Sequence, residues 1–184
     1  MDTSQLRFTR LQNEIFRILC IETGVSLNQR EVAKALSVSP TAVAKALKGL
    51  EKDALITVEK SKTMNLVSIK LNRDNPKAIA LKRVENLKQI YESDILGYLE
   101  DCFPGSTIIV FGSYSQGEDT VNSDIDIAII GYKEKDLDLG KYEKILKRSI
   151  SIHNYTSLKE INRNLKGNIL NGITLQGVVE LCGY

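Results

Sequence analysis

The amino-acid sequence predicts an α+β fold in two parts, and three observations lead to this expectation. Residues 6–52 contain three stretches with apolar residues at helical spacing, followed by two short β-rich stretches. Residues 107–111 are an apolar run of strand length, and residues 124–130 place two aspartates among apolar residues over a similar length. Helical patterns over residues 76–102 lie between these blocks. Helices and strands that fall in separate blocks are typical of α+β proteins.

Composition is that of a folded chain. The 184 residues are 42% hydrophobic and 26% charged, enough for one ordinary domain or two small ones. No apolar run is long enough to span a bilayer, and the first residues contain no apolar signal region. We therefore expect a cytoplasmic protein without a membrane partner. Its three cysteines are scattered and contain no C-x-x-C pair, so we expect them to be reduced.

Residues 6–52 are expected to form three helices. Residues 6–21 and 28–36 carry apolar side chains at helical spacing, and Gly24 ends the first helix. Ser39 is a favourable N-cap, and Pro40 suits the first position of a third helix that runs to Lys52. Val43, Ala46, Leu47 and Leu50 share one side of this helix.

Two strands are expected next, at residues 55–59 and 66–71, because LITVE and LVSIKL are rich in apolar and β-branched residues. Three helices followed by a hairpin resemble the winged helix-turn-helix domain of transcription regulators. The resemblance covers roughly residues 5–72, and we place this domain at 1–72.

By this resemblance, the helix over residues 40–52 is a recognition helix that enters the major groove of DNA. Its early exposed residues would approach base edges, and the lysines further along would meet phosphates. The alternative is a winged helix that contacts protein. The helix over residues 40–52 contains no arginine, the residue that most often contacts guanine, and this is consistent with the alternative. The candidate DNA-binding residues are Thr41, Ala42, Lys45, Lys48, Lys60 and Lys62.

A connector helix is expected over residues 73–92, with Pro76 at its first position. Its apolar side could pack within the chain or against a second copy. We expect a homodimer, because operators read by winged helices are commonly two-fold. A further helix ends at Phe103-Pro104-Gly105, and residues 93–184 are assigned to a second domain.

The most informative stretch is FGSYSQGEDTVNSDIDIAII, residues 111–130. Gly112 allows close approach of the backbone to a ligand, and Ser113 offers a hydroxyl and an amide at a helix start, where phosphate is favoured. Asp124 and Asp126 are two residues apart on an expected strand, so their side chains project together. We expect Mg²⁺ to relieve the repulsion between these carboxylates and to bridge them to the phosphate.

The spacing G-S-x-x-x-G-x-x-x-x-x-S-D-I-D resembles the nucleotidyltransferases of the DNA polymerase β superfamily, closest to their minimal members. The resemblance covers roughly residues 90–184 and implies a small mixed β-sheet with flanking helices. It implies that Gly112, Ser113, Gly117 and Ser123 bind a nucleoside triphosphate. Asp124 and Asp126 would be catalytic and bind Mg²⁺ or Mn²⁺. The reaction would move a nucleoside monophosphate to an acceptor hydroxyl and release pyrophosphate.

The sequence departs from this family in two places. Active members usually carry a third carboxylate on a later strand. The candidate strand, residues 148–153, has Ser151 at the corresponding position and His153 beyond it. No arginine stands between Ser113 and Gly117, so triphosphate binding would depend on Lys133, Lys135 or Arg148. Residues 154–182 are expected to be helical.

Three functions stay open at this point. The first is a DNA-binding nucleotidyltransferase that uses a nucleoside triphosphate such as ATP. The second is a transcription regulator whose degenerate transferase domain binds or senses a nucleotide. The third is an antitoxin-like transferase that modifies a protein partner.

Overall fold

A computed structural model of the protein describes residues 8–60 and 67–179, without the side chain of Lys60. The chain divides into two units, Met1–Lys82 and Arg83–Tyr184. The division falls inside the long helix α4 (Pro76–Glu92). No helix within the described ranges has both the length and the apolar character needed to cross a membrane.

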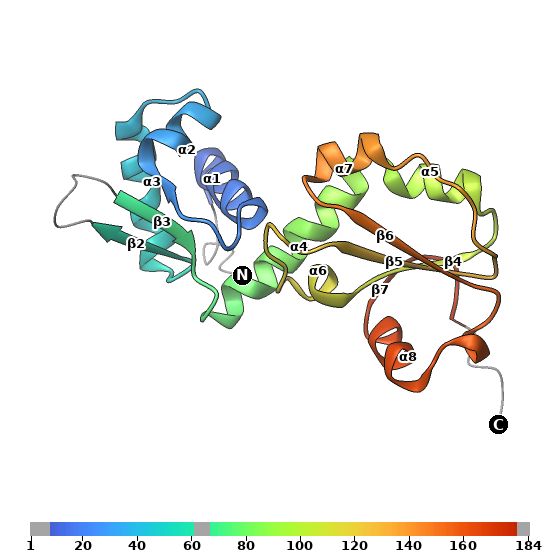
Figure 1. Ribbon diagram of the computed structural model, residues 1–184. Helices are drawn as coiled ribbons and strands as arrows, with labels where there is room; N and C mark the ends of the chain where they lie inside the picture. Colours follow the sequence, from blue (N-terminus) through green and yellow to red (C-terminus); the bar gives the residue numbers. More distant parts are fainter. Residues whose placement is uncertain (1–7, 61–66, 180–184) are drawn as a thin grey trace, which may run out of the picture. The chain divides into compact units, whose positions relative to one another are not determined.

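The first unit places three helices against a small antiparallel sheet (Figure 1). The strands lie in the order β1-β3-β2, with Leu27 opposite Ile69 and Ile56 opposite Leu71. This arrangement is the winged helix that the sequence predicts, with β1 as an additional two-residue strand. Its elements are α1 (Arg10–Ile21), β1 (Leu27–Asn28), α2 (Gln29–Ala35), α3 (Pro40–Lys52), β2 (Ile56–Lys60) and β3 (Val67–Leu71).

Capping residues set where the helices of this unit begin. The Ser39 hydroxyl accepts a hydrogen bond from the Ala42 amide at 3.2 Å, so α3 starts at Pro40 as expected. Helix α1 begins at Arg10, later than expected, because Thr9 and Gln12 form a reciprocal capping box. The buried sides of the three helices and the sheet form one apolar core that includes Ile15, Val32, Val43, Leu50 and Ile69.

The second unit contains a four-stranded mixed sheet in the order β6-β5-β4-β7. Strand β4 pairs antiparallel with β5 and β7, and β5 pairs parallel with β6. The mixed sheet with flanking helices is the α+β core that the sequence predicts. Its elements after α4 are α5 (Ile95–Cys102), β4 (Thr107–Phe111), α6 (Gly112–Gln116), β5 (Ile125–Ile130), α7 (Gly140–Leu146), β6 (Ile150–Tyr155), the 3-10 helix η2 (Leu158–Glu160), α8 (Arg163–Leu170) and β7 (Ile173–Gln176).

Helices cover both faces of this sheet: Figure 1 shows α5 and α7 on one face and α8 on the other. Alternate residues of the strands belong to two separate clusters, as strand geometry requires. Val110 and Ile127 pack in the cluster that contains Leu99 of α5 and Leu146 of α7. Phe111 and Ala128 pack in the cluster that contains Ile169 of α8.

The expectation of a wholly helical carboxyl-terminal segment is wrong. Helix α8 ends at Leu170, and residues 173–176 form the edge strand β7 against β4. Gly172 makes this possible, because a Cβ there would lie 2.5 Å from the Val110 carbonyl oxygen. The apolar residues around Leu175 therefore follow the sheet rather than a helical stripe. Cys182 lies outside the described residues.

Candidate functional site

The Gly-Ser turn lies where strand β4 passes into helix α6. Gly112 has a φ of +71°, a conformation that residues with a side chain rarely adopt. The Ser115 hydroxyl donates to the Gly112 carbonyl oxygen at 2.8 Å, and Gly117 ends the helix with a φ of +78°. The turn is thus held by its own hydrogen bonds, with the Ser113 side chain half-buried.

Gly112 lies directly beside Asp126. Phe111 pairs with Asp126 across β4 and β5, which brings the next residue, Gly112, close to the aspartate side chain. A Cβ on Gly112 would stand 2.7 Å from Asp126 Oδ2. The missing side chain therefore makes room for the carboxylate, and the Gly-Ser turn and the second aspartate of the motif form one site.

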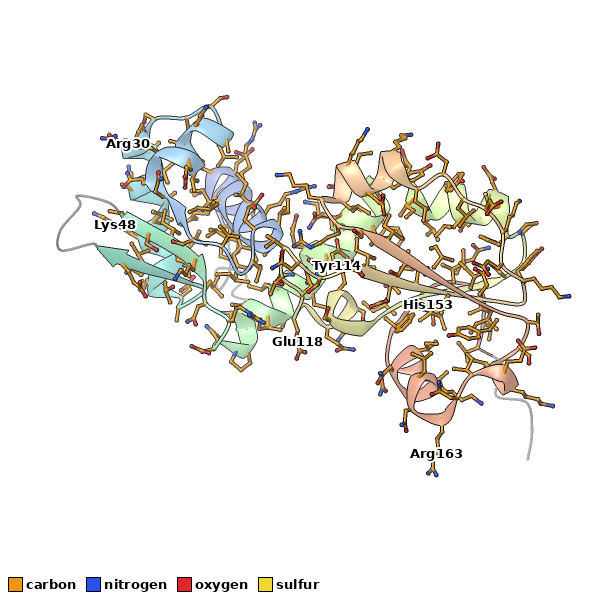
Figure 2. The ribbon with its side chains drawn as sticks, in the orientation of Figure 1. Arg30, Lys48, Tyr114, Glu118, His153 and Arg163 are labelled. Atoms are coloured by element: carbon orange, nitrogen blue, oxygen red, sulfur yellow. The ribbon has the colours of Figure 1, made fainter. Side chains whose placement is uncertain are left out.

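The same carboxylate contacts the histidine of β6. His153 Nε2 lies 3.2 Å from Asp126 Oδ1. The two side chains are 35% and 32% exposed, so both are open to a ligand while being held in place. The Phe111 ring packs edge-on against the imidazole, with ring centroids 5.3 Å apart. Figure 2 shows His153 on the sheet of the second unit.

Ser151 is the residue that pairs with Asp126 on the adjacent parallel strand. The resemblance to the nucleotidyltransferases implies a third carboxylate at this strand position, and the chain has a hydroxyl there. Ser151 and His153 are two residues apart on β6, so they share the face of the sheet that carries Asp126. The site therefore contains one carboxylate, one hydroxyl and one imidazole on neighbouring strands.

Asp124 stands just outside the strand. Strand β5 begins at Ile125, one residue later than expected, and Asp124 is exposed. It lines an open pocket of about 500 Å³ together with residues that precede β6. Lys144 and Lys147 line this pocket too, and neither is among the site residues predicted from the sequence. The sequence feature that could have indicated them is the cluster of basic residues immediately before β6.

Ser123 and Arg148 have structural contacts in the second unit. The Ser123 hydroxyl accepts a hydrogen bond from the Thr120 amide at 3.0 Å and closes the turn that precedes Asp124. Arg148 was expected to be one of the cations able to hold a triphosphate. Its guanidinium is instead buried and forms an ion pair with Asp119 at 3.3 Å.

The described residues contain no group of three or more His, Cys, Asp or Glu side chains able to hold a metal ion. Asp126 and His153 nevertheless supply an oxygen donor and a nitrogen donor close together. Both donor types bind divalent metals, so the pair fits a cation whose other ligands come from substrate or water.

The exposed side of α3 carries the candidate DNA-binding residues that the structure describes. Thr41, Lys45 and Lys48 are exposed, and Ala42 is half-buried. Figure 2 labels Lys48 on this unit. The side chain of Lys60 and the whole of Lys62 lie outside the described residues. The apolar side of α3 is buried, so the helix presents a polar and basic surface to any partner.

The second unit thus combines a mixed sheet with a Gly-Ser turn whose backbone lies beside an aspartate. Residues 92–173 match the family model described as the nucleotidyltransferase domain. The second unit is therefore a nucleotidyltransferase domain, which confirms the resemblance drawn from the sequence. A search of curated proteins finds no match to this chain.

Several solved structures resemble part of the chain. The zinc-responsive MarR family member ZitR of Lactococcus lactis is 27% identical, over 56% of this chain and 68% of its own, with a TM-score of 0.41. The adhesin competence repressor AdcR of Streptococcus pyogenes is 21% identical, over 55% and 71%, with a TM-score of 0.43. The MepR–DNA complex of S. aureus is 20% identical, over 52% and 77%, with a TM-score of 0.38. The winged-helix assignment rests on the chain's own strand order, because these scores are too low to carry an argument.

Proposed function

We propose that the second unit transfers a nucleoside monophosphate from a nucleoside triphosphate to an acceptor hydroxyl. The acceptor oxygen forms a bond to the α-phosphorus, and the bond from that phosphorus to the bridging oxygen breaks. Pyrophosphate leaves, and the hydroxyl proton passes to water or to a basic side chain. A divalent cation, when bound, supplies charge neutralisation at the phosphate under attack.

The chain's own residues orient the reactants in this proposal. The turn at Gly112 and Ser113 holds the triphosphate in this proposal, and the space left at Gly112 lets the Asp126 carboxylate lie directly beside that turn. Asp126, with Asp124 just before the strand, provides the anionic ligands. Lys144 and Lys147 line the pocket that contains Asp124, and we propose that their charge attracts phosphate oxygens.

The observation that carries this proposal is the fit of the Asp126 carboxylate against Gly112 in a domain that matches the nucleotidyltransferase family. The test incubates the protein with labelled ATP, CTP, GTP and UTP, each with Mg²⁺, Mn²⁺ or Zn²⁺, and measures pyrophosphate release and self-labelling. Asp126→Ala is expected to abolish turnover, and Asp136→Ala, an exposed loop variant of the same charge change, to retain it. Equal turnover in Asp126→Ala and wild type would reject the proposal.

One observation favours a second function, in which the domain binds a nucleotide without turnover. Ser151 stands opposite Asp126, and a hydroxyl holds a metal ion less strongly than a carboxylate does. In this case nucleotide binding would change the affinity of the first unit for DNA. The same incubations separate the two functions: bound label with no pyrophosphate, together with a shift in DNA affinity, identifies the sensor.

We also propose that the first unit binds DNA through the exposed side of α3. Exposed Thr41, Lys45 and Lys48 support this, since a basic helix at the end of a helix-turn-helix suits the major groove. Gel-shift and anisotropy titrations with mixed-sequence duplex DNA test it. Binding that does not weaken with added salt would count against an interface of this kind.

A homodimer is the proposed assembly, with α4 as its contact. Val84 and Tyr91 on this helix are 64% and 50% exposed. Together with Leu87 they line an apolar hollow of about 450 Å³. Two copies of α4 packed antiparallel would place Val84 of one beside Tyr91 of the other. Val84→Glu is expected to produce a monomer in sedimentation velocity, and an unchanged sedimentation coefficient would exclude this contact.

A further inference from the structure

We propose that Asp126 and His153 together bind one divalent ion of the zinc and cobalt type, in preference to Mg²⁺. The inference deepens the proposed function, because it assigns the ligands and the class of metal at the same carboxylate. Three observations support it: the types of the two ligand atoms, the distance between them, and the serine at position 151 of β6.

His153 Nε2 and Asp126 Oδ1 form a hydrogen bond, and their separation also matches that of adjacent ligands on one metal ion. Ligand atoms at about 2.0–2.2 Å from a metal lie about 3.0 Å apart at a right angle and about 3.4 Å apart at a tetrahedral angle. His153 Nε2 and Asp126 Oδ1 are 3.2 Å apart, between these two values. A metal can therefore enter between them with small side-chain adjustments.

Both side chains are fixed by the sheet around them. Asp126 and His153 lie on adjacent parallel strands, with Asp126 paired to Ser151 and His153 paired to Ala128. The Phe111 ring packs edge-on against the imidazole, and Gly112 leaves space for the other carboxylate oxygen. A pair held in this way loses little conformational entropy when it binds an ion.

The donor set selects the class of ion. Imidazole suits zinc, cobalt and nickel, whereas magnesium takes oxygen ligands almost exclusively. A carboxylate at position 151 would have completed an oxygen site, but the chain has serine there and places the imidazole two residues further along the strand. An imidazole beside a single carboxylate therefore favours borderline cations over hard ones.

The remaining coordination positions are open. Asp126 and His153 are each about one-third exposed, so water or phosphate oxygens have access to a metal between them. With no third ligating side chain gathered near them in the described parts of the chain, binding of the ion alone is expected to be weak. A nucleoside triphosphate should strengthen it by supplying further oxygens.

The single histidine of the chain makes the test direct. Every imidazole signal in a ¹H–¹⁵N spectrum of the untagged protein belongs to position 153. Zn²⁺ added with ATP is expected to shift the imidazole nitrogen resonances until one equivalent is bound, whereas Mg²⁺ in tenfold excess is expected to leave them unchanged. Imidazole chemical shifts that do not change when Zn²⁺ is added, with or without ATP, would overturn the proposal.

Two variants sharpen the result. Asp126→Asn should weaken Zn²⁺ binding by about tenfold or more, while the imidazole signal remains that of the folded protein. The control variant Asp136→Asn should bind Zn²⁺ as tightly as the wild type. His153→Asp should lower the ratio of Zn²⁺ to Mg²⁺ affinity, measured by calorimetry, by about tenfold or more, because it makes both ligand atoms oxygens. An unchanged ratio in His153→Asp would contradict the assignment of the imidazole as a ligand.

This test and the test of nucleotidyl transfer can fail separately. Zn²⁺ coordination by His153 without pyrophosphate release would leave the metal site standing and remove the transferase. If His153→Ala retained turnover with Mg²⁺ and Zn²⁺ did not shift the imidazole resonances, the transferase proposal would stand and the metal-site proposal would be rejected.

Discussion

Asp119 and Arg148 form an ion pair in the interior of the second unit. Arg148 Nη2 lies 3.3 Å from Asp119 Oδ2, and the two side chains are 3% and 0% exposed. The Asn86 amide of α4 donates to Asp119 Oδ1 at 2.7 Å and to the Tyr114 carbonyl oxygen at 2.9 Å. Asp119 thus connects the loop that leads to Asp124 with α4, through Asn86, and with the segment just before β6, through Arg148.

Replacing Asp119 with alanine is expected to destabilise the second unit strongly. The change removes the carboxylate that compensates a buried guanidinium, and breaking such a pair costs about 3–5 kcal/mol. Chemical denaturation followed by circular dichroism measures the loss. Asp136→Ala, an exposed change of the same charge, should alter stability by less than about 0.5 kcal/mol. A cost in Asp119→Ala as small as that of the control would show that the pair contributes little.

Local patterns made much of this fold predictable. Ser39 and Pro40 set the start of α3 as expected, and residues 107–111 form β4 with the expected bounds. The Gly112–Gln116 helix and the buried β5 follow from the same reasoning. These features depend on neighbours a few residues away, and capping, periodicity and glycine conformation report such neighbours directly.

Contacts between distant segments were not predictable. Asp119 and Arg148 are 29 residues apart, and His153 and Asp126 are 27 residues apart, so only the tertiary fold reveals these contacts. Arg148 is one of three cations that the sequence offers for triphosphate binding, because its burial has no local signal. Strand β7 was missed for the same reason: its pairing depends on the space at Gly172, and that space exists only once β4 is in place.

The space at Gly112 provides a sharp test of the site. Gly112→Ala would place a Cβ 2.7 Å from Asp126 Oδ2, so the carboxylate must move. We expect about a hundredfold loss of transfer, or of nucleotide affinity if the wild-type protein only binds, since a displacement near 1 Å has effects of this size. The readouts are pyrophosphate release and calorimetric titration with the preferred nucleotide.

Gly105→Ala is the matched control for this substitution. Gly105 has a φ of +77°, close to that of Gly112, but no atom within 4 Å of the added Cβ. Backbone strain is therefore similar in the two variants, and only Gly112→Ala disturbs Asp126. Equal loss in both variants would attribute the effect to strain and remove the argument for the close approach.

The lysines of α3 give a test of DNA binding. Lys48→Ala should weaken binding to about the same extent on every duplex and lower the slope of log affinity against log salt by about 1, because a phosphate contact reads no sequence. Fluorescence anisotropy at several salt concentrations measures the slope. Lys159→Ala, an exposed lysine of the second unit, is the control for charge. A slope that Lys48→Ala leaves unchanged would favour the protein-contact function of the winged helix.

Gly172 is expected to control the attachment of β7 to the sheet. A Cβ there would lie 2.5 Å from the Val110 carbonyl oxygen and 2.9 Å from that of Ile169, and neither backbone atom can move away cheaply. Gly172→Ala should therefore destabilise the second unit by about 1–3 kcal/mol and increase hydrogen exchange at the β7 amides. Gly167→Ala lies inside α8 with nothing within 4 Å, and should instead stabilise the unit by about 0.5–1 kcal/mol. If both variants were stabilised, β7 would have to reach β4 without the close approach at Gly172.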